Sequence, residues 1–347
     1  MRELTFVRPG CVQWRDVPAP TLEAPTDALV RPLAATTCDL DAFTLAGKSP
    51  LAALAPFAFG HEFVAEVSEC GDQVRGVSPG DRVVVPFQIS CGACERCDRN
   101  HTGSCASVPP RSMYGFGAMG GAWGGAFSDL VRVPFADAML VALPNGVAAE
   151  QVASLSDNLP DGYRTVAPHL AERPGADVLV IGGGASSIPL YAVAIARALG
   201  AGSVVYCDQH PARLAIAERL GAEVRSGELP SRAGEFAISV DASAERDGLV
   251  CALRSLEPGG VCTSIGIYYE DVALPLLDMY TRGVRFHTGR VDARADIPAV
   301  LELVRDGRIA PELVNSEVLD WEDAPRALAD PSFKPVFVRH LDAAAHP

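Results

Sequence analysis

The sequence is poor in basic residues. Its 347 residues include 29 lysines and arginines against 43 aspartates and glutamates, which gives a formal net charge of −14 at pH 7. A chain of this charge is repelled by the phosphates of nucleic acids and by anionic lipid headgroups. We therefore expect neither a nucleic acid nor a membrane among its partners.

We expect neither a signal peptide nor a low-complexity linker in this chain. No cationic start followed by an apolar stretch is present, so no signal peptide is predicted. The uncharged run 178–196 is long enough to raise the question of a membrane span, but its glycines, its serines and Pro189 favour a buried strand, turn and helix. No internal repeat and no low-complexity linker occurs. We expect a cytoplasmic protein.

Cysteine, by contrast, is plentiful: the chain has ten, and four of them lie in one short loop. They are Cys91, Cys94, Cys97 and Cys105, in the run SCGACERCDRNHTGSC. Four thiolates at this spacing can close a tetrahedron around one Zn²⁺. The alternatives are two disulfides or four unrelated thiols, and disulfides need an oxidising compartment. The spacing favours a closed structural zinc site, which holds a loop but performs no chemistry.

Length and hydrophobic pattern both indicate two domains. A single core seldom holds 347 residues. Residues 1–150 are β-rich, whereas strands alternate with helices from about residue 175, which predicts an α/β fold with a doubly wound parallel sheet. The expected strands after that point are 177–181, 203–207, 236–241 and 260–267, and the expected helices are 185–199, 212–220 and 297–306.

A glycine-rich turn predicts a dinucleotide site. The run VLVIGGGASSIPL places Gly182 and Gly184 directly after a buried strand, where a pyrophosphate can approach the backbone and the helix N-terminus. Ser187 replaces the usual third glycine. Asp208 ends the next strand, where a carboxylate can bind the adenosine ribose hydroxyls and repel a 2′-phosphate; its alternative role is to cap the following helix. The pattern favours NAD, although Arg213 leaves room for NADP.

A second group of metal ligands is also predicted. Cys38 lies in TTCDLD, and His61 and Glu62 lie in FGHEF. An open catalytic zinc site needs three protein ligands and a free position. No cysteine occurs between Cys105 and Cys207, so a third ligand from that stretch must be of another type, and Asp157 in SLSDNLPDGY is the best candidate. Asp41 and Glu62 are expected to orient His61 or the metal.

These motifs together resemble the zinc-dependent alcohol dehydrogenase branch of the medium-chain dehydrogenase/reductase superfamily. The resemblance rests on TTCDLD, FGHEF, GDRVVVPF, the four-cysteine loop, LSDNLPDGY and the glycine-rich turn, and it covers nearly the whole chain. LSDNLPDGY is closest to the subgroup that includes glutathione-independent formaldehyde dehydrogenases and threonine-type dehydrogenases.

The resemblance implies a fold and a quaternary structure. A GroES-like catalytic domain would span 1–150 and be completed by 290–347, and a Rossmann NAD-binding domain would span 151–289. Relatives with this zinc loop are dimers or tetramers, usually paired through the Rossmann sheet edge near 260–267. We therefore expect a homodimer or a homotetramer.

The resemblance also implies a reaction. Two Zn²⁺ would bind each subunit, one on the four cysteines and one, the catalytic ion, on Cys38, His61 and Asp157. Such enzymes transfer hydride between NAD(H) and an alcohol or its aldehyde or ketone partner.

Further positions carry roles by the same resemblance. Phe87 matches a substrate-pocket position. Ile265 and Ile267 match the strand end that meets the nicotinamide carboxamide. Lys334 matches, more loosely, a residue that approaches the pyrophosphate.

The sequence departs from the family at the proton relay. Leu40, in the substrate pocket, replaces a Ser or Thr that passes the alcohol proton outward, and Phe43 replaces a frequent His. Asp161 stands where relatives have a Thr against the nicotinamide. Either Asp161 takes over the lost acid–base role, or it points away or caps the following helix.

Three functions are compatible with these residues. The leading one is oxidation of an alcohol or reduction of its carbonyl partner. The loss of the hydroxyl relay would also suit reduction of a conjugated C=C or C=N bond, or a redox-neutral dismutation with tightly held NAD. A non-catalytic nucleotide-binding protein is disfavoured, because it would not need an open metal site.

Overall fold

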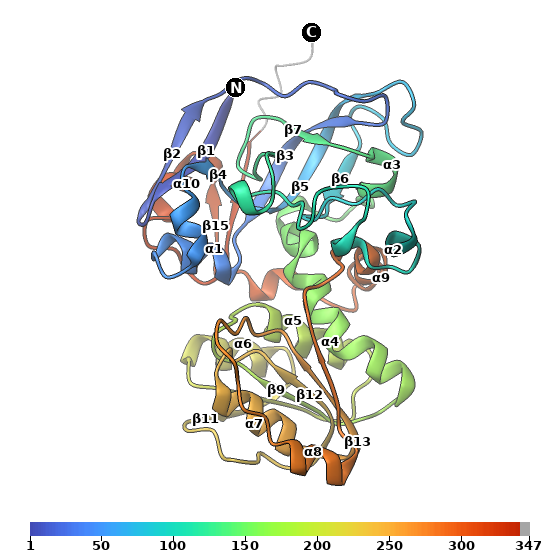
Figure 1. Ribbon diagram of the computed structural model, residues 1–347, viewed down its shortest axis with the longest axis vertical. Coiled ribbons are helices and arrows are strands. Elements are labelled where there is room, and N and C mark those ends of the chain that lie inside the picture. Colours follow the sequence, from blue (N-terminus) through green and yellow to red (C-terminus); the bar gives the residue numbers. More distant parts are fainter. Residues whose placement is uncertain (341–347) are drawn as a thin grey trace. The chain divides into compact units, whose positions relative to one another are not determined.

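The computed structural model describes residues 1–340, which form two compact units. Among the described residues, the first unit contains 1–157, 292–305 and 315–340, and the second contains 158–291 and 306–314. Each unit has its own sheet and its own core, and Figure 1 shows the elements of both.

The first unit is built mainly from strands. A seven-stranded sheet has the order β15-β16-β3-β5-β6-β8 with β7 paired to β3, and a three-stranded sheet has the order β2-β1-β4. The strands are β1 (Arg2–Arg8), β2 (Cys11–Asp16), β3 (Ala28–Thr36), β4 (Phe57–Ala58), β5 (Glu62–Cys70), β6 (Arg82–Val85), β7 (Val131–Val133), β8 (Val141–Ala142), β15 (Glu317–Asp320) and β16 (Pro335–Val338). Its helices are α1 (Asp39–Leu45), α2 (Glu95–Asp98), α3 (Ala136–Met139), α9 (Ala293–Arg305) and α10 (Ala324–Ala327).

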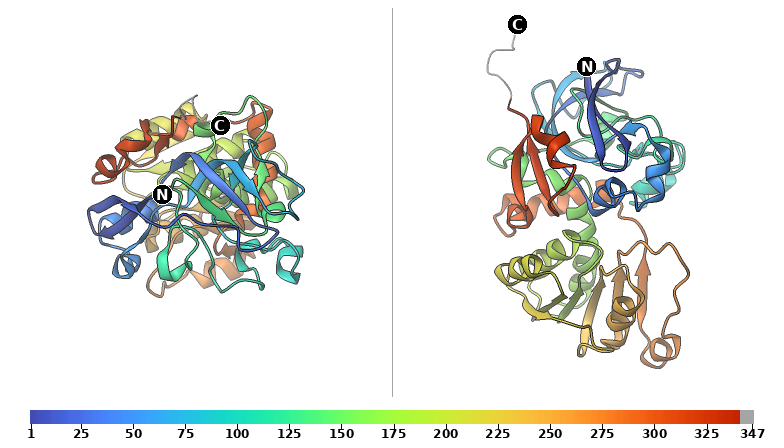
Figure 2. Two further views of the ribbon diagram at one scale, coloured as in Figure 1. Left: turned by 90° about the horizontal axis from the view of Figure 1, so that it is seen from above. Right: turned by 90° about the vertical axis from the view of Figure 1, so that its left-hand side faces the viewer.

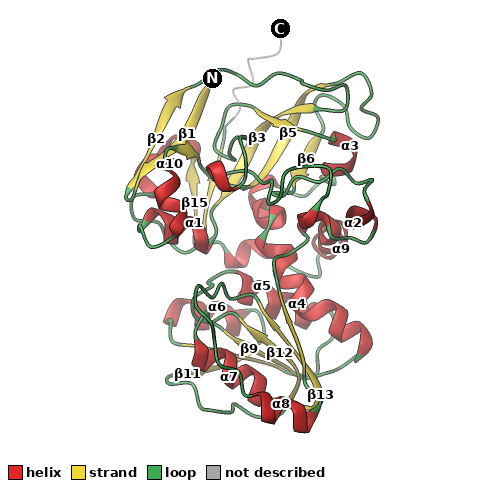
Figure 3. Ribbon diagram, in the orientation of Figure 1, coloured by secondary structure: helices red, strands yellow, loops and turns green. Residues whose placement is uncertain are grey.

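The second unit is a six-stranded sheet with the order β11-β10-β9-β12-β13-β14, and every pairing in it is parallel. The strands are β9 (Val178–Ile181), β10 (Val204–Asp208), β11 (Glu223–Ser226), β12 (Phe236–Asp241), β13 (Leu256–Ser264) and β14 (Arg285–Thr288). The helices are α4 (Asn158–Glu172), α5 (Ile188–Ala198), α6 (Pro211–Arg219), α7 (Arg246–Arg254) and α8 (Leu276–Arg282). Figures 2 and 3 show these helices and strands from other sides and by type.

The predicted α/β alternation is confirmed, and burial explains it. Every residue of β9 and β12 is buried, as expected for central strands of a parallel sheet that is covered on both faces. Helices α4 and α5 approach closely because Gly162 has no side chain: a Cβ there would lie 2.9 Å from the Cβ of Tyr191. The run 178–196 forms β9, a turn and most of α5. Among the described residues, no helix is both long and apolar enough to cross a membrane.

The free edges of the parallel sheet differ from the expected one. The segment 260–267 was expected at the edge, but β13 pairs with both β12 and β14 and is therefore interior. The edge on this side is β14, a short strand that follows α8. Periodicity in the sequence did not reveal β14, because only one of its four residues is even partly buried.

The segment 151–157 belongs to the first unit, although the sequence-based boundary assigned it to the second domain. Its hydrogen bonds explain this placement. The Oγ of Ser156 accepts from the backbone N–H of Phe63 at 2.9 Å and donates to the carbonyl of the same residue at 2.9 Å. The backbone N–H of Phe87 donates to the Ser156 carbonyl at 3.1 Å. These bonds attach the segment to β5 and deliver Asp157 to the first unit.

Candidate metal centres and cofactor site

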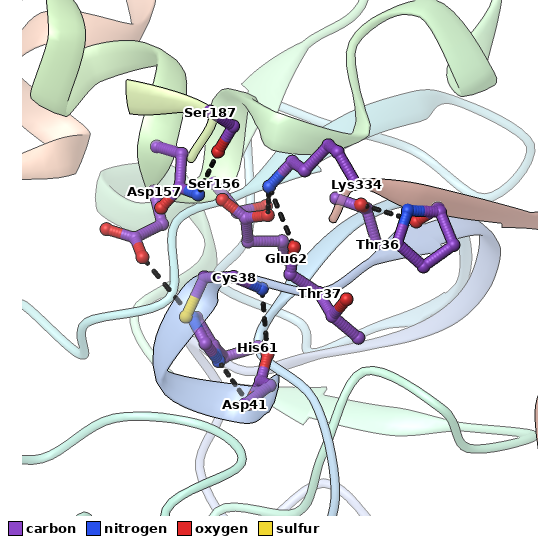
Figure 4. Close-up of polar contacts among 12 residues, drawn as sticks. Thr36, Thr37, Cys38, Asp41, His61, Glu62, Ser156, Asp157, Ser187 and Lys334 are labelled. Atoms are coloured by element: carbon purple, nitrogen blue, oxygen red, sulfur yellow. Dashed lines mark hydrogen bonds and ion pairs between the residues drawn. The ribbon is translucent and has the colours of Figure 1, made fainter. Parts of the chain in front are cut away.

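Cys38, His61 and Asp157 converge in the first unit (Figure 4). One ligand atom from each lies within 4.8 Å of the others. Cys38 precedes α1, His61 precedes β5, and Asp157 follows a 3-10 turn at 153–156. The Nε2 of His61 lies 3.2 Å from Oδ2 of Asp157. A thiol, an imidazole and a carboxylate are a suitable donor set for an open zinc site.

The backbone before His61 explains how this ligand is aimed. Gly60 has a φ of +85°, which disfavours any residue with a side chain. A Cβ at Gly60 would also lie 2.6 Å from the ring of Phe127. The glycine therefore permits a bend, packed against the aromatic core, directly before the ligand.

Asp41 contacts two of the three ligand residues. Its Oδ2 accepts a hydrogen bond from the backbone N–H of Cys38 at 3.0 Å, and its Oδ1 lies 3.5 Å from Nδ1 of His61. The side chain is buried and lies in the first turn of α1. A carboxylate behind a histidine ligand orients the ring and selects its tautomer. Asp41 thus stands where the sequence analysis expected a supporting carboxylate.

The charges in this cluster fit a bound cation. Burial, reinforced by Asp41, raises the pKa of the Cys38 thiol to about 12. Burial disfavours the charged form of His61, but Asp41, Cys38 and Asp157 raise its pKa well above the usual value. Two buried groups and a largely buried carboxylate are therefore held together, with Asp41 behind them. A divalent cation would balance them.

A buried ion pair lies beside the cluster. The Nζ of Lys334 bonds to Oε2 of Glu62 and donates to the carbonyl of Thr37 at 2.9 Å, and both charged side chains are fully buried. Burial raises the pKa of Glu62 to about 7, although the charge of Lys334 lowers it. These partners are 272 residues apart in sequence. The family resemblance matched Lys334 loosely to a residue that approaches the pyrophosphate, and its link to Glu62 was not predicted.

Two aromatic rings face the histidine ligand. The centroid of Phe87 lies 5.4 Å from that of His61, and the centroid of Phe116 lies 4.7 Å from it. Phe87 was predicted to line the substrate pocket. Phe116 was not predicted, because it lies in a glycine-rich loop with no periodic pattern. Both rings are buried, so the surroundings of the imidazole are apolar on these sides.

The four-cysteine loop forms the second cluster. Its four Sγ atoms lie within 4.8 Å of one another, and all four cysteines are free thiols. Backbone N–H groups point at the sulfurs: the N–H of Cys91 lies 3.4 Å from the sulfur of Cys105, and that of Ala106 lies 3.4 Å from the sulfur of Cys94. The bond from Ala106, followed by others from the backbone, lowers the pKa of Cys94 to about 6. These features suit thiolates around a single metal ion.

The loop is tied to helix α9 by one carboxylate. The backbone N–H of Gly103 donates to Oδ1 of Asp292 at 2.7 Å, and Nδ1 of His101 lies 3.4 Å from the other oxygen. A Cβ at Gly103 would lie 2.4 Å from the amide nitrogen of Gln88. The loop therefore packs against the start of α9 as well as enclosing its ligand position.

The glycine-rich turn of the second unit leads from β9 toward α5. The N–H of Gly184 donates to the carbonyl of Ser243 at 2.9 Å, and a Cβ at Gly184 would lie 2.7 Å from that oxygen. Ser187 precedes α5, and its Oγ accepts a hydrogen bond from Nδ2 of Asn158 at 2.8 Å (Figure 4). Ser187 thus joins α4 to α5 where the third glycine would only permit packing. The contact of Asn158 with Ser187 was not predicted, although Asn158 lies in LSDNLPDGY, because the motif does not record a partner 29 residues away.

Asp208, at the end of β10, is 5% exposed. Its carboxylate accepts from Nη2 of Arg213 at 2.8 Å and from the hydroxyl of Tyr206 at 2.6 Å. Burial opposes the charge, but Arg213, Tyr206 and the N–H of His210 lower its pKa. The Nη1 of Arg213 also donates to Oγ of Ser186 at 3.1 Å, whereas its buried Nε has no hydrogen-bond partner. An ionised carboxylate at the end of this strand suits the ribose hydroxyls of a dinucleotide.

Comparison with known proteins shows to which family this chain belongs. Residues 24–145 match the alcohol dehydrogenase GroES-like domain, and residues 187–306 match the zinc-binding dehydrogenase family. The chain is 31% identical over 297 residues to an alcohol dehydrogenase of Cupriavidus necator, covering 80% of this chain and 79% of that one. The chain belongs to the zinc-dependent alcohol dehydrogenase family.

The family assignment extends to the structure. The alcohol dehydrogenase TADH from Thermus sp. ATN1 superposes with a TM-score of 0.88 at 32% identity, covering 98% of this chain and 100% of that chain. The glutathione-independent formaldehyde dehydrogenase of Pseudomonas aeruginosa is 36% identical over 236 residues, which is 64% of this chain. The match spans 58% of the length of that relative.

The structure shows the surroundings of the three residues that depart from the family pattern. Leu40 lies in the first turn of α1 and is partly exposed, and Phe43 is 37% exposed. Asp161 lies in the first turn of α4, where Nε of Arg164 bonds to it at 2.6 Å. Arg164 also donates to the carbonyl of Gly289 at 2.7 Å. The charge of Asp161 is therefore paired, which favours a structural role over that of a proton acceptor.

The two isoleucines assigned to the nicotinamide differ in their surroundings. The backbone N–H of Ile265 donates to the carbonyl of Asp241 at 2.9 Å, which holds it at the end of β13. Ile267 follows two residues later and its side chain is 53% exposed. Only the first of them is therefore held by the sheet.

Proposed function

We propose that this chain is a zinc-dependent oxidoreductase that transfers hydride between NAD(H) and an alcohol or its aldehyde or ketone partner. The observation that carries the proposal is the convergence of Cys38, His61 and Asp157 within 4.8 Å. A zinc ion held by them would act as a Lewis acid on the substrate oxygen. Asp41 orients His61 from behind, and the four-cysteine loop would hold a second, structural zinc.

The residues around the ligands suggest an uncharged substrate. Phe87 and Phe116 lie against His61, and Leu40 follows Cys38 by two residues. None of these side chains can bind a carboxylate or a phosphate. We therefore propose a small, apolar alcohol or carbonyl compound as the substrate.

A cofactor-linked screen tests the function. The purified protein is assayed with a panel of short-chain, branched and aromatic alcohols and with the corresponding aldehydes and ketones, while NADH absorbance is followed. We expect turnover with uncharged members, and none with matched carboxylates or sugar phosphates. The absence of NADH formation or consumption across the panel, with full zinc content, would contradict the proposal.

We propose NAD rather than NADP as the preferred cofactor. The support is Asp208, whose pKa is lowered by Arg213 and Tyr206, so it stays ionised and would repel a 2′-phosphate. The ratio of kcat/KM for the two cofactors should favour NAD, and Asp208→Ala should narrow it. A wild-type preference for NADP would transfer the specificity role to Arg213.

A second candidate reaction follows from Leu40, which carries no proton. Reduction of a conjugated C=C or C=N bond delivers the proton to carbon or nitrogen instead of an alcohol oxygen. In a dismutation with tightly held NAD, the proton released when the hydrated aldehyde is oxidised can pass to the alkoxide formed from the second aldehyde. Dismutation would appear as conversion of an aldehyde to equal amounts of alcohol and acid with no added cofactor. A strict requirement for added NAD(H) would exclude it.

We also propose a homodimer or homotetramer. Strand β14 is an open sheet edge, and five large apolar side chains of the second unit are more than half exposed. They are Ile267, Tyr269, Leu276, Leu277 and Tyr280. Such an edge and such apolar residues favour pairing with a second copy. Light scattering should give at least twice the 36.5 kDa chain mass, and a monomer would contradict the proposal.

A further inference from the structure

Tyr206 and Asp208 form a buried pair above the glycine-rich turn. They are two residues apart on β10, so their side chains leave the same face of the sheet. The Tyr206 hydroxyl donates to Oδ2 of Asp208 at 2.6 Å. A Cβ at Gly182 would lie 2.4 Å from that Oδ2 and 2.6 Å from the tyrosine oxygen. The first glycine of the turn therefore makes room for this pair, in addition to permitting the bend.

The two oxygens of Asp208 are occupied unequally. Its Oδ1 accepts from the backbone N–H groups of Gln209 and His210, at 2.6 and 2.9 Å, and from Nη2 of Arg213 at 2.8 Å. Its Oδ2 accepts one hydrogen bond, from Tyr206. A carboxylate oxygen offers about two acceptor positions. The open position of Asp208 is therefore on Oδ2, the oxygen that Tyr206 holds.

The neighbouring guanidinium of Arg213 also has an unused hydrogen-bond donor. Arg213 engages Asp208 through Nη2 alone, and its buried Nε–H has no hydrogen-bond partner. Arginine and carboxylate groups commonly form two parallel hydrogen bonds, here expected as Nη2 to one oxygen and Nε to the other. In the structure Oδ2 accepts from Tyr206 and makes no bond with this Nε. Without that bond, the carboxylate can rotate and close the second hydrogen bond with Arg213.

We propose that Tyr206 is a positioning residue of the ribose site: its hydroxyl prevents Asp208 from closing onto Arg213 and so keeps Oδ2 available to an adenosine ribose hydroxyl. The inference rests on the proposed function, in which NAD binds the second unit. Tyr206 is fully buried, so its proposed effect on the ribose is transmitted by its bond to Asp208. A 2′-phosphate brings no donor for Oδ2, so Tyr206 should favour a free 2′-hydroxyl.

Calorimetric titration with ADP-ribose and with 2′-phospho-ADP-ribose tests this role without catalysis. Tyr206→Phe should weaken ADP-ribose binding about five- to tenfold, since a charged hydrogen bond is lost, and should change binding of the phosphorylated ligand less than about twofold. Tyr114→Phe is the matched control, because it removes another buried tyrosine hydroxyl, which donates to the Arg132 carbonyl at 2.9 Å in the first unit. It should leave both dissociation constants unchanged.

A double-mutant cycle separates positioning from a loss of packing. Lysine cannot form the two-pronged contact, so in an Arg213→Lys background Tyr206→Phe should weaken ADP-ribose binding less than about twofold. Arg213→Lys alone should keep ADP-ribose affinity within about threefold, because Tyr206 still holds Oδ2. This single variant tests the idea even where Tyr206→Phe fails to fold, as judged by near-UV circular dichroism.

The outcomes are distinct. An unchanged ADP-ribose affinity in folded Tyr206→Phe would overturn the role of Tyr206 while leaving the NAD site intact. An equal loss in the Arg213→Lys background, or a tenfold loss in Arg213→Lys alone, would also overturn it. Failure of the wild-type protein to bind ADP-ribose would instead contradict the proposed function itself.

Discussion

The two groups of metal ligands are assembled in opposite ways. Four cysteines between residues 91 and 105 meet within one loop, and two of them are partly exposed. The cluster of Cys38, His61 and Asp157 draws on three distant elements, and its first two members are buried. The loop can form from local spacing alone, whereas the buried cluster exists only once β3, β5 and the 153–156 turn have packed together.

The side chains that support the two groups of ligands also differ in their exposure to water. The loop is tied to α9 by Asp292, whose side chain is 29% exposed. Next to His61, by contrast, the ion pair of Glu62 and Lys334 is fully removed from water. Because water does not reach this pair, removing one partner would leave the other charge buried without a partner. We therefore expect substitutions at the buried cluster to affect chemistry, and substitutions in the loop to affect stability.

The largest effect is expected on activity. Cys38→Ala removes a ligand of the proposed open site, and kcat/KM should fall by about 10³-fold or more. Elemental analysis should show about one zinc per subunit instead of two, with the melting temperature nearly unchanged. Full zinc and a full rate in this variant would show that Cys38 is not a ligand.

Cys97→Ala should do the reverse. Loss of one of four ligands opens the closed site, and a structural zinc contributes directly to folding. We expect a loss of about 3 kcal/mol or more in the free energy of unfolding, seen in thermal melts followed by circular dichroism. Activity per remaining folded molecule should stay near wild type. A variant of normal stability with one zinc would mean that the loop needs no metal.

Lys334→Met tests the buried pair. Removing the cation leaves Glu62 buried among other carboxylates, which we expect to cost about 2–4 kcal/mol of stability. The second lysine of the chain, Lys48, is exposed, and Lys48→Met is the matched control with an expected effect below about 0.5 kcal/mol. Adding Glu62→Gln to Lys334→Met should restore part of the loss. Equal stability of the two lysine variants would contradict the argument.

Two buried histidines among the described residues have pKa values shifted in opposite directions. Carboxylates raise the pKa of His61, whereas burial, followed by His287 and Arg285, lowers the pKa of His169 to about 4. In the unfolded chain His169 has the ordinary histidine pKa of about 6.5. The unfolded state therefore binds more protons than the folded state between about pH 4 and 6.5. Stability should therefore fall as the pH drops through that window.

His169→Gln should flatten this pH dependence. We expect the variant to lose about 1–2 kcal/mol less than wild type between pH 6.5 and pH 4, measured by urea unfolding. The exposed His210 supplies the control, and His210→Gln should retain the wild-type slope. Parallel curves for wild type and His169→Gln would show that His169 titrates normally.

The smallest effect concerns the second carboxylate of LSDNLPDGY. Asp157 faces His61, but Asp161 is paired with Arg164 at 2.6 Å. Asp161→Asn should therefore change kcat less than about tenfold, below the 10²–10⁴-fold typical of a general base. A larger loss of kcat with unchanged NAD affinity would instead assign proton transfer to Asp161. Leu40→Ser should then partly rescue the variant.

Motifs made of neighbouring residues were predictable from the sequence. The cysteine spacing, the glycine-rich turn after β9 and the alternation of strands and helices are local patterns, and the fold that they predicted is confirmed by the family match. The observed bounds of β12 are those expected. The strand was predictable because its sequence is mostly apolar and lies between turns. The edge strand β14 was missed, since an exposed strand carries no such pattern.

The sequence by itself thus determined the fold class, the candidate ligand residues and the family, because these depend on residue chemistry at short spacing. Only the tertiary structure decided which distant groups meet, as Lys334 does with Glu62 and Phe116 with His61. Strand pairing and core packing bring such partners together, and no local pattern records that pairing. The division between 157 and 158 was settled in the same way, by the hydrogen bonds of Ser156 to β5.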